Sequence, residues 1–194
     1  VCSSDLESSS RADREELYRW IEYYKIKFKS RVYTPLNNSE KYTLVLMGRA
    51  DFGLLGSYNK YKQTPFETFH VGGDGMTGSY TYATETIGLR GYDNGALTPY
   101  SDGRAYTRFS MELHFPFLLQ PSSTIYGLAF VEGGNAWTSL ENFNPFSLKR
   151  SAGVGVRIFL PMIGLMGIDW AYGFDKVQGE KGGGHFHFIL GQEF

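Results

Sequence analysis

Hydrophobic and polar residues alternate along most of the chain, as expected for half-exposed β-strands, whose successive side chains point to opposite faces. The alternation is clearest in residues 104–115, where apolar residues such as Phe109 and Met111 are separated by polar ones such as Glu112. The pattern predicts seven strands, at residues 17–34, 41–56, 104–118, 124–137, 148–160, 165–175 and 185–194. The sequence therefore predicts an all-β fold.

The two faces of these strands differ in a way that favours a membrane barrel. The apolar face carries aromatic residues near strand ends, such as Trp20, Trp170 and Tyr172, where the interfacial girdles of a barrel lie. The opposite face carries charged residues and many glycines, which suit a water-filled lumen better than a packed core. A soluble β-sandwich also alternates, but its apolar face turns inward onto a second sheet. We therefore favour the transmembrane barrel and keep the sandwich as the alternative.

The number of strands indicates part of a larger barrel. Most predicted strands are about ten residues long, as a tilted strand must be to cross a bilayer. Closed single-chain barrels of bacteria have an even number of strands, because an open edge leaves backbone groups unsatisfied in lipid. We expect residues 17–194 to form the C-terminal seven or so antiparallel strands of a barrel whose other strands precede residue 1. The polar, Ser-rich residues 1–16 are expected to be a disordered or foreign N-terminal edge.

Composition argues against several other classes. The chain has 194 residues and a formal net charge of −1. It contains no apolar run of about 18 residues, the length of a membrane-spanning helix, so no such helix is expected. Nucleic acid is not expected as a partner, because binding a phosphate backbone requires a concentrated basic surface. One cysteine, Cys2, allows no internal disulfide.

A long loop, residues 57–103, separates the second and third predicted strands. Its segments "PFETFHVGGDGM" (65–76) and "GLRGY" (88–92) resemble the sixth extracellular loop of the BamA family, the insertases of the outer-membrane-protein-85 superfamily. Further matches follow in order: "MELHFPF" (111–117), "FVEGGNAW" (130–137), "SAGVGVRIFLP" (151–161), "GIDWAYGFD" (167–175) and "FHFILGQEF" (186–194). The resemblance covers about residues 17–194.

The resemblance implies that the protein inserts and assembles β-barrel proteins in the bacterial outer membrane, through a barrel similar to the family's sixteen-stranded one. No enzyme activity, cofactor or metal is expected. The implied partners are outer-membrane lipid, unfolded β-barrel clients and, in full-length family members with periplasmic POTRA domains, accessory lipoproteins. No POTRA domain is expected in this chain. The TamA-like branch of the superfamily shares the loop motif and remains an alternative.

The family's loop motif is matched in two places, by Phe66, Phe69, Gly72, Gly73 and Asp74 and then by Arg90, Gly91 and Tyr92. In the family this loop folds into the lumen, and its arginine meets acidic residues of the inner wall, which correspond here to Glu112 and Glu132. A guanidinium offers a planar fork of donors that suits such carboxylates. The alternative is an ordinary solvated Arg90, with Glu112 paired to Arg104 or Arg108.

Strand parity predicts an inward side chain for Glu112 but not clearly for Glu132. Glu112 has the inward parity of its strand. Glu132 shares its parity with apolar neighbours such as Phe130, in a stretch that is apolar on both faces. Either a bulge at Gly133–Gly134 re-aims Glu132, or the inner face of that strand is aromatic.

The C-terminal segment resembles the β-signal that barrel proteins present to the assembly machinery. Its residues of interest are Phe186, Phe188, Leu190, Gly191 and Phe194. In the BamA family this strand also forms a lateral seam with the first barrel strand, and the resemblance implies that the seam opens and lets an incoming strand add by β-augmentation. Gly191 is consistent with weak pairing there, although a plain closing strand explains it equally well.

Other functions have weaker support. The glycine-rich residues 71–75 lack the Lys-Ser/Thr of a phosphate loop. His185 and His187 could ligate a metal, but no third ligand has a recognisable spacing, so we expect solvated histidines. A hydrolase site built from acidic residues would lack a nucleophile. A passive porin is the stronger competitor, because the cations of the first strand could line an anion-selective pore: Arg19, Lys25, Lys27, Lys29 and Arg31.

Overall fold

Seven strands form one antiparallel sheet in which the strand order is β1-β2-β5-β6-β7-β8-β9. The computed structural model describes residues 22–37, 43–58, 67–75, 84–98, 102–120, 123–161, 164–177 and 182–190. The strands of the sheet are β1 (Tyr23–Pro35), β2 (Val45–Ser57), β5 (Ala105–Gln120), β6 (Ser123–Trp137), β7 (Lys149–Leu160), β8 (Gly164–Gly173) and β9 (Gly184–Leu190). The predicted all-β, antiparallel fold is confirmed.

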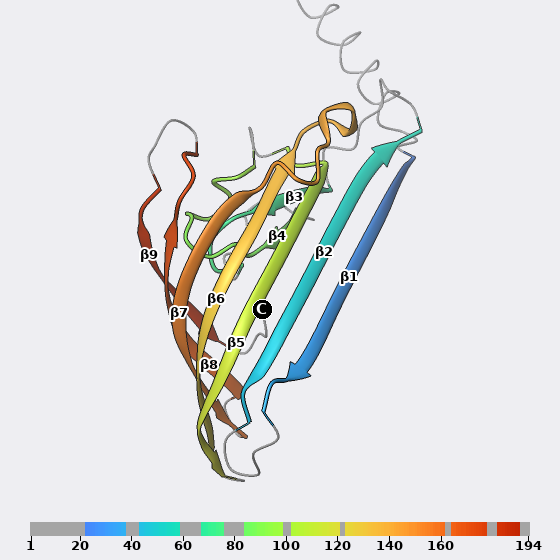
Figure 1. Ribbon diagram of the computed structural model, residues 1–194. Helices are drawn as coiled ribbons and strands as arrows, with labels where there is room; N and C mark the ends of the chain where they lie inside the picture. The colour runs from blue at the N-terminus through green and yellow to red at the C-terminus, as the bar shows by residue number, and fades with distance from the viewer. Residues whose placement is uncertain are drawn as a thin grey trace, which may run out of the picture.

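The sheet is a curved wall, and a second, smaller sheet lies on its concave side (Figure 1). This smaller sheet consists of β3 (Thr68–Val71) and β4 (Thr84–Ile87), which pair in parallel. Both belong to the long loop between β2 and β5, and sequence analysis did not predict them. A short 3-10 helix, Leu140–Asn142, lies between β6 and β7. In the described part of the chain, no helix is long and apolar enough to cross a membrane.

The two faces of the wall differ as the alternation predicted. On β8, Ile168 and Trp170 are 53% and 44% exposed on the convex face, whereas Asp169 between them is fully buried on the concave face. On β1, Ile26 and Phe28 are likewise exposed. Within the described residues no second layer covers the apolar convex face, so the sandwich alternative is wrong. The apolar face is the surface that a barrel turns toward hydrocarbon.

The concave side is more apolar than the expected water-filled lumen. A buried apolar cluster joins the loop to the wall and consists of Leu55, Phe69, Val71, Ile87, Leu89, Tyr92, Leu97, Tyr106 and Ala136. The rings of Phe69 and Tyr106 meet edge to face, with centroids 4.7 Å apart. Most of the apolar side chains of this cluster belong to the loop and not to the wall strands. The polar inner face of the wall strands, read alone, therefore predicted a wetter lumen than the structure has.

Some predictions concern residues outside the described ranges. The proposed N-terminal edge, residues 1–16, is among them, as are Phe66, Gly191 and Phe194. The predicted start of the first strand at residue 17 and end of the last at residue 194 also lie outside these ranges, and the other predicted strand limits differ from those observed by at most four residues. The third strand is longer than predicted and continues to Gln120, past a register irregularity between Pro116 and Leu118.

Candidate functional site: the Arg90 cluster

Arg90 lies where the loop returns from the β3–β4 sheet to the wall. Leu89 before it is buried in the apolar cluster and forms an isolated bridge with Gly73. Gly91 after it has a φ of 89°, a left-handed value that favours glycine. A Cβ on Gly91 would also lie 2.9 Å from the Cβ of Ser151 and 3.0 Å from the amide nitrogen of Gly173. The motif therefore needs glycine both for its turn and for its close approach to β7 and β8.

The side chain of Arg90 is fully buried and contacts three carboxylates from three strands. Its Nη2 donates to Glu112 on β5 and, at 2.6 Å, to Oε1 of Glu132 on β6. Its Nη1 lies 3.0 Å from Oδ2 of Asp169 on β8. The backbone N–H of Arg90 donates to the second oxygen of Glu132 at 2.9 Å. Arg90 thus links β5 and β6 to β8, which pairs with neither of them.

Two more arginines complete the charge balance around these carboxylates. Arg108 on β5 donates to Oε1 of Glu132 at 3.0 Å. Arg157 on β7 donates to both oxygens of Asp169, at 2.5 and 2.6 Å. We call this set the Arg90 cluster: Arg90, Arg108, Arg157, Glu112, Glu132 and Asp169. Burial opposes the charge of Arg90, but the carboxylates of Glu132 and Glu112 outweigh it, so the pKa of Arg90 is raised above its ordinary value.

An aromatic side chain on the inner face of β6 packs against the guanidinium of Arg90. The guanidinium carbon of Arg90 lies 3.5 Å from the centroid of the Phe130 ring, a cation–π arrangement. Glu132 is paired with Ser110 of β5, and the register runs without interruption through Gly133 and Gly134. The bulge considered for Gly133–Gly134 is therefore absent, and the aromatic inner face is the correct alternative.

The structure brings Arg90, Glu112 and Glu132 together, as the resemblance implied. The alternative pairing of Glu112 with Arg104 or Arg108 does not occur, because Glu112 contacts Arg90 and His114. Asp169 was not predicted as a third acidic partner. Its inward parity on β8 was visible in the sequence, but nothing in that pattern shows that curvature brings β8 close to β5 and β6.

The other residues of the loop motif shape the path of the loop rather than contact the cluster. Gly72 and Gly73 have φ values of 133° and 74°, and the amide of Gly72 donates to the carbonyl of Ile87. Asp74 donates its amide to the side-chain oxygen of Asn94. The hydroxyl of Tyr92 donates to the carbonyl oxygen of Arg150 at 2.6 Å.

A second set of ion pairs attaches the loop to the opposite part of the wall. Lys25, Lys27 and Lys29 of β1, which we call the lysine ladder, all face Glu85 of β4 at 3.1, 3.0 and 3.6 Å. Lys25 also lies 2.6 Å from Glu67. These three cations, considered above as the lining of an anion pore, are therefore engaged by the loop.

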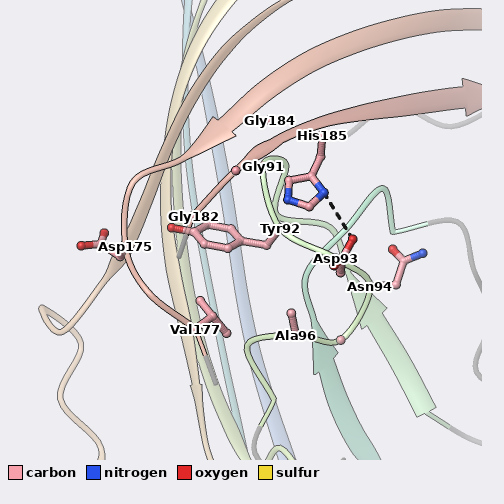
Figure 2. A pocket seen from close by; sticks show the side chains of 12 residues that line it. Gly91, Tyr92, Asp93, Asn94, Ala96, Asp175, Val177, Gly182, Gly184 and His185 are labelled. Carbon is pink, nitrogen blue, oxygen red and sulfur yellow. Dashed lines mark ion pairs between the residues drawn. The ribbon is translucent and has the colours of Figure 1, made fainter. Parts of the chain in front are cut away.

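The last described strand, β9, forms one edge of the sheet and pairs with β8. Phe186, Phe188 and Leu190 point outward and are 70%, 60% and 59% exposed. Both inward histidines contact the loop, but only His187 is buried, so the expectation of a solvated histidine is wrong for His187, whereas His185 remains partly exposed. His185 Nδ1 lies 3.2 Å from Asp93, and a dashed line marks this ion pair in Figure 2. His187 is buried, and its Nε2 accepts a hydrogen bond from the amide of Gly91 at 2.9 Å.

A cavity of about 550 Å³ lies beside the Asp93–His185 pair. One wall is the loop from Gly91 to Ala96, and the other is the connection between β8 and β9, including Asp175 and Gly182 (Figure 2). Among the residues that the structure describes, no group of three acidic, histidine or cysteine side chains is arranged to hold a metal ion. The site is thus a buried ion-pair network between a loop and its wall.

Comparison with known proteins agrees with this architecture. Residues 9–194 match the Omp85 superfamily domain. The fold is similar to the crystal structure of BamA from Haemophilus ducreyi lacking POTRA domains 1–3, with a TM-score of 0.60 and 21% sequence identity. The match covers 86% of this chain but 34% of that one, so the chain spans about a third of the length of the relative. The chain belongs to the Omp85 superfamily of bacterial outer-membrane proteins, a family that serves protein assembly and transport.

Proposed function

We propose that the protein containing this chain inserts and assembles β-barrel proteins in the outer membrane, and that this chain supplies the C-terminal part of its barrel wall. The observation that carries the proposal is the Arg90 cluster. Arg90, buried among three carboxylates of the wall, supports a loop that occupies the concave side, whereas a passive channel needs a water-filled path there. An insertase needs a wall whose shape and internal loop stay fixed while its edge strand pairs with an incoming strand.

The proposal assigns different roles to the two sides of the wall. The Arg90 cluster braces β5, β6, β7 and β8 from inside, and the lysine ladder attaches the same loop to β1. The edge strand β9 exposes backbone donors and acceptors that can pair with an incoming strand. Clients are therefore unfolded outer-membrane strands, and no covalent chemistry is involved. Accessory lipoproteins would bind parts of the protein other than this chain.

The test is assembly by the full-length protein in lipid vesicles. Urea-unfolded β-barrel client is added, and its folding is followed as the appearance of a heat-resistant band on a gel. We expect folding to be accelerated by the unmodified protein and by Arg150→Ala, a control that removes an exposed guanidinium. Arg90→Ala should accelerate it much less. Equal rates in empty vesicles and in vesicles with the unmodified protein would contradict the proposal.

A conductance measurement separates the proposal from the porin alternative. A barrel plugged by its own loop should conduct poorly and irregularly, whereas a porin should conduct steadily. Steady, anion-selective conductance of the full-length protein, with no effect on client folding, would establish the channel instead.

A further inference from the structure

The contact between His187 and Gly91 joins the loop to the last strand directly. Gly91 follows Arg90, and its amide points across the wall to Nε2 of His187 on β9, 2.9 Å away. The turn cannot easily aim this amide elsewhere, because Gly91 is wedged against Ser151 of β7 and Gly173 of β8. His187 itself is 6% exposed. The fixed amide and the buried imidazole therefore meet in a single defined geometry.

The direction of this hydrogen bond fixes the charge state of the imidazole. A backbone N–H can donate only, so Nε2 must present a lone pair, and the ring must be neutral with its proton on Nδ1. A protonated ring carries N–H groups on both nitrogens, and it would turn a donor toward a donor. The contact is therefore incompatible with imidazolium.

We propose that the neutral imidazole of His187 is a positioning group that couples the Arg90 segment to the last strand, and that protonation of the ring uncouples them. While the bond is intact, β9 is attached to the braced loop as well as to β8. Without it, the described part of β9 keeps its ladder to β8 and the more exposed Asp93–His185 pair. The importance of this for client insertion rests on the proposed function, because only there does movement of the edge strand matter.

Charged groups from each packed element surround the imidazole and set the pH of the change. Asp74 and Arg90 approach from the loop, Asp169 from β8 and His185 from β9 itself. Asp169 is already engaged by two arginines. An ordinary histidine takes up its proton near pH 6.5, and the fixed amide opposes protonation here, so the comparison runs from about pH 8 down to about pH 4.

Hydrogen–deuterium exchange at the Gly91 amide tests the proposal on the full-length protein in lipid vesicles, without any client. Protection is corrected for the intrinsic pH dependence of exchange. We expect the unmodified protein to lose protection at Gly91 by about tenfold between about pH 8 and about pH 4, the effect of losing roughly one hydrogen bond. His187→Gln should keep its protection at both pH values, because an amide oxygen accepts the same bond and does not titrate.

His185→Gln is the matched control, since it removes the neighbouring imidazole but leaves the Gly91 contact in place. It should respond to pH as the unmodified protein does. The proposal is overturned if Gly91 protection in the unmodified protein is independent of pH, or if His187→Gln retains the full response. It is also overturned if His185→Gln is the variant that abolishes the response. These outcomes do not depend on client folding, so failure of the coupling and failure of the proposed function are distinguishable.

Discussion

At the scale of single residues, Arg90 shows why arginine cannot be replaced by another cation here. Its fork reaches carboxylates on three strands, and its flat face lies on the Phe130 ring. A lysine offers a single ammonium and no planar face, so it could satisfy only part of this arrangement. The remaining carboxylates would then be buried with too few donors, which is costly.

Arg90→Ala should therefore destabilise the attachment of the loop by about 3–5 kcal/mol, the usual cost of breaking a buried pair. The expected result is faster cleavage of the loop when the folded full-length protein is exposed to a protease. Arg90→Lys should give an intermediate rate. A cleavage pattern identical to that of the unmodified protein would contradict the role of the Arg90 cluster as a clamp.

The acidic partners should respond differently from one another. Glu132 accepts hydrogen bonds from the side chain and the backbone of Arg90 and from Arg108. Glu112 contacts the side chain of Arg90 and the half-buried ring of His114. Glu132→Gln should loosen the loop more than Glu112→Gln, by about tenfold in protease cleavage rate if one additional charged hydrogen bond is lost. The two variants compared side by side test this order, and equal rates would show that the contacts are energetically equivalent.

At the scale of elements, alternation in the sequence was sufficient for the wall and insufficient for the loop. Each of the seven wall strands has one face toward lipid and one toward the lumen, so parity located them. The strands β3 and β4 have four residues each and exist because they dock on the wall, and no local pattern of that length identifies them. The contact between β9 and the loop was missed for the same reason, since it joins residues that are 96 positions apart.

The lysine ladder makes the attachment of β4 sensitive to salt and acid. Burial raises the pKa of Glu85, but hydrogen bonds from Lys27 and Lys25 outweigh this effect, so the pKa is lowered from its ordinary value. The ion pairs of Glu85 therefore contribute their full stabilisation above the pKa of an unfolded glutamate, about 4.3. This stabilisation is lost as the pH falls through the lower pKa of Glu85 in the folded protein. At about pH 5 the ladder should therefore remain intact.

Glu85→Gln should weaken this attachment by about 1 kcal/mol or less, because the lysines are partly exposed and screened by water. At low salt, hydrogen–deuterium exchange at the amides of β4 should be faster in Glu85→Gln than in the unmodified protein. This difference should shrink at about 1 M salt. A difference that does not change with salt would mean that packing, rather than charge, holds β4 on β1.

At the scale of the whole molecule, the wall has two edges. In the described residues β1 pairs with β2 alone and β9 with β8 alone. An open edge in lipid leaves donors and acceptors unsatisfied, so this chain expressed by itself should not close into a stable barrel. Refolded in detergent, it should give no compact band that resists heating on a gel. Such a band at the mass of the single chain would show that seven strands suffice.

The unequal attachments of the loop have a mechanical consequence. Arg90 fits one position, whereas Glu85 faces three lysines spaced along β1 at steps of about 6.6 Å, two residues of an extended strand. All three ammonium groups reach the one carboxylate, so a shift of one step along β1 would part Glu85 from some of them and leave others in reach, whereas the same shift at Arg90 would break all of its contacts. The loop should therefore loosen at β1 before it loosens at the Arg90 cluster.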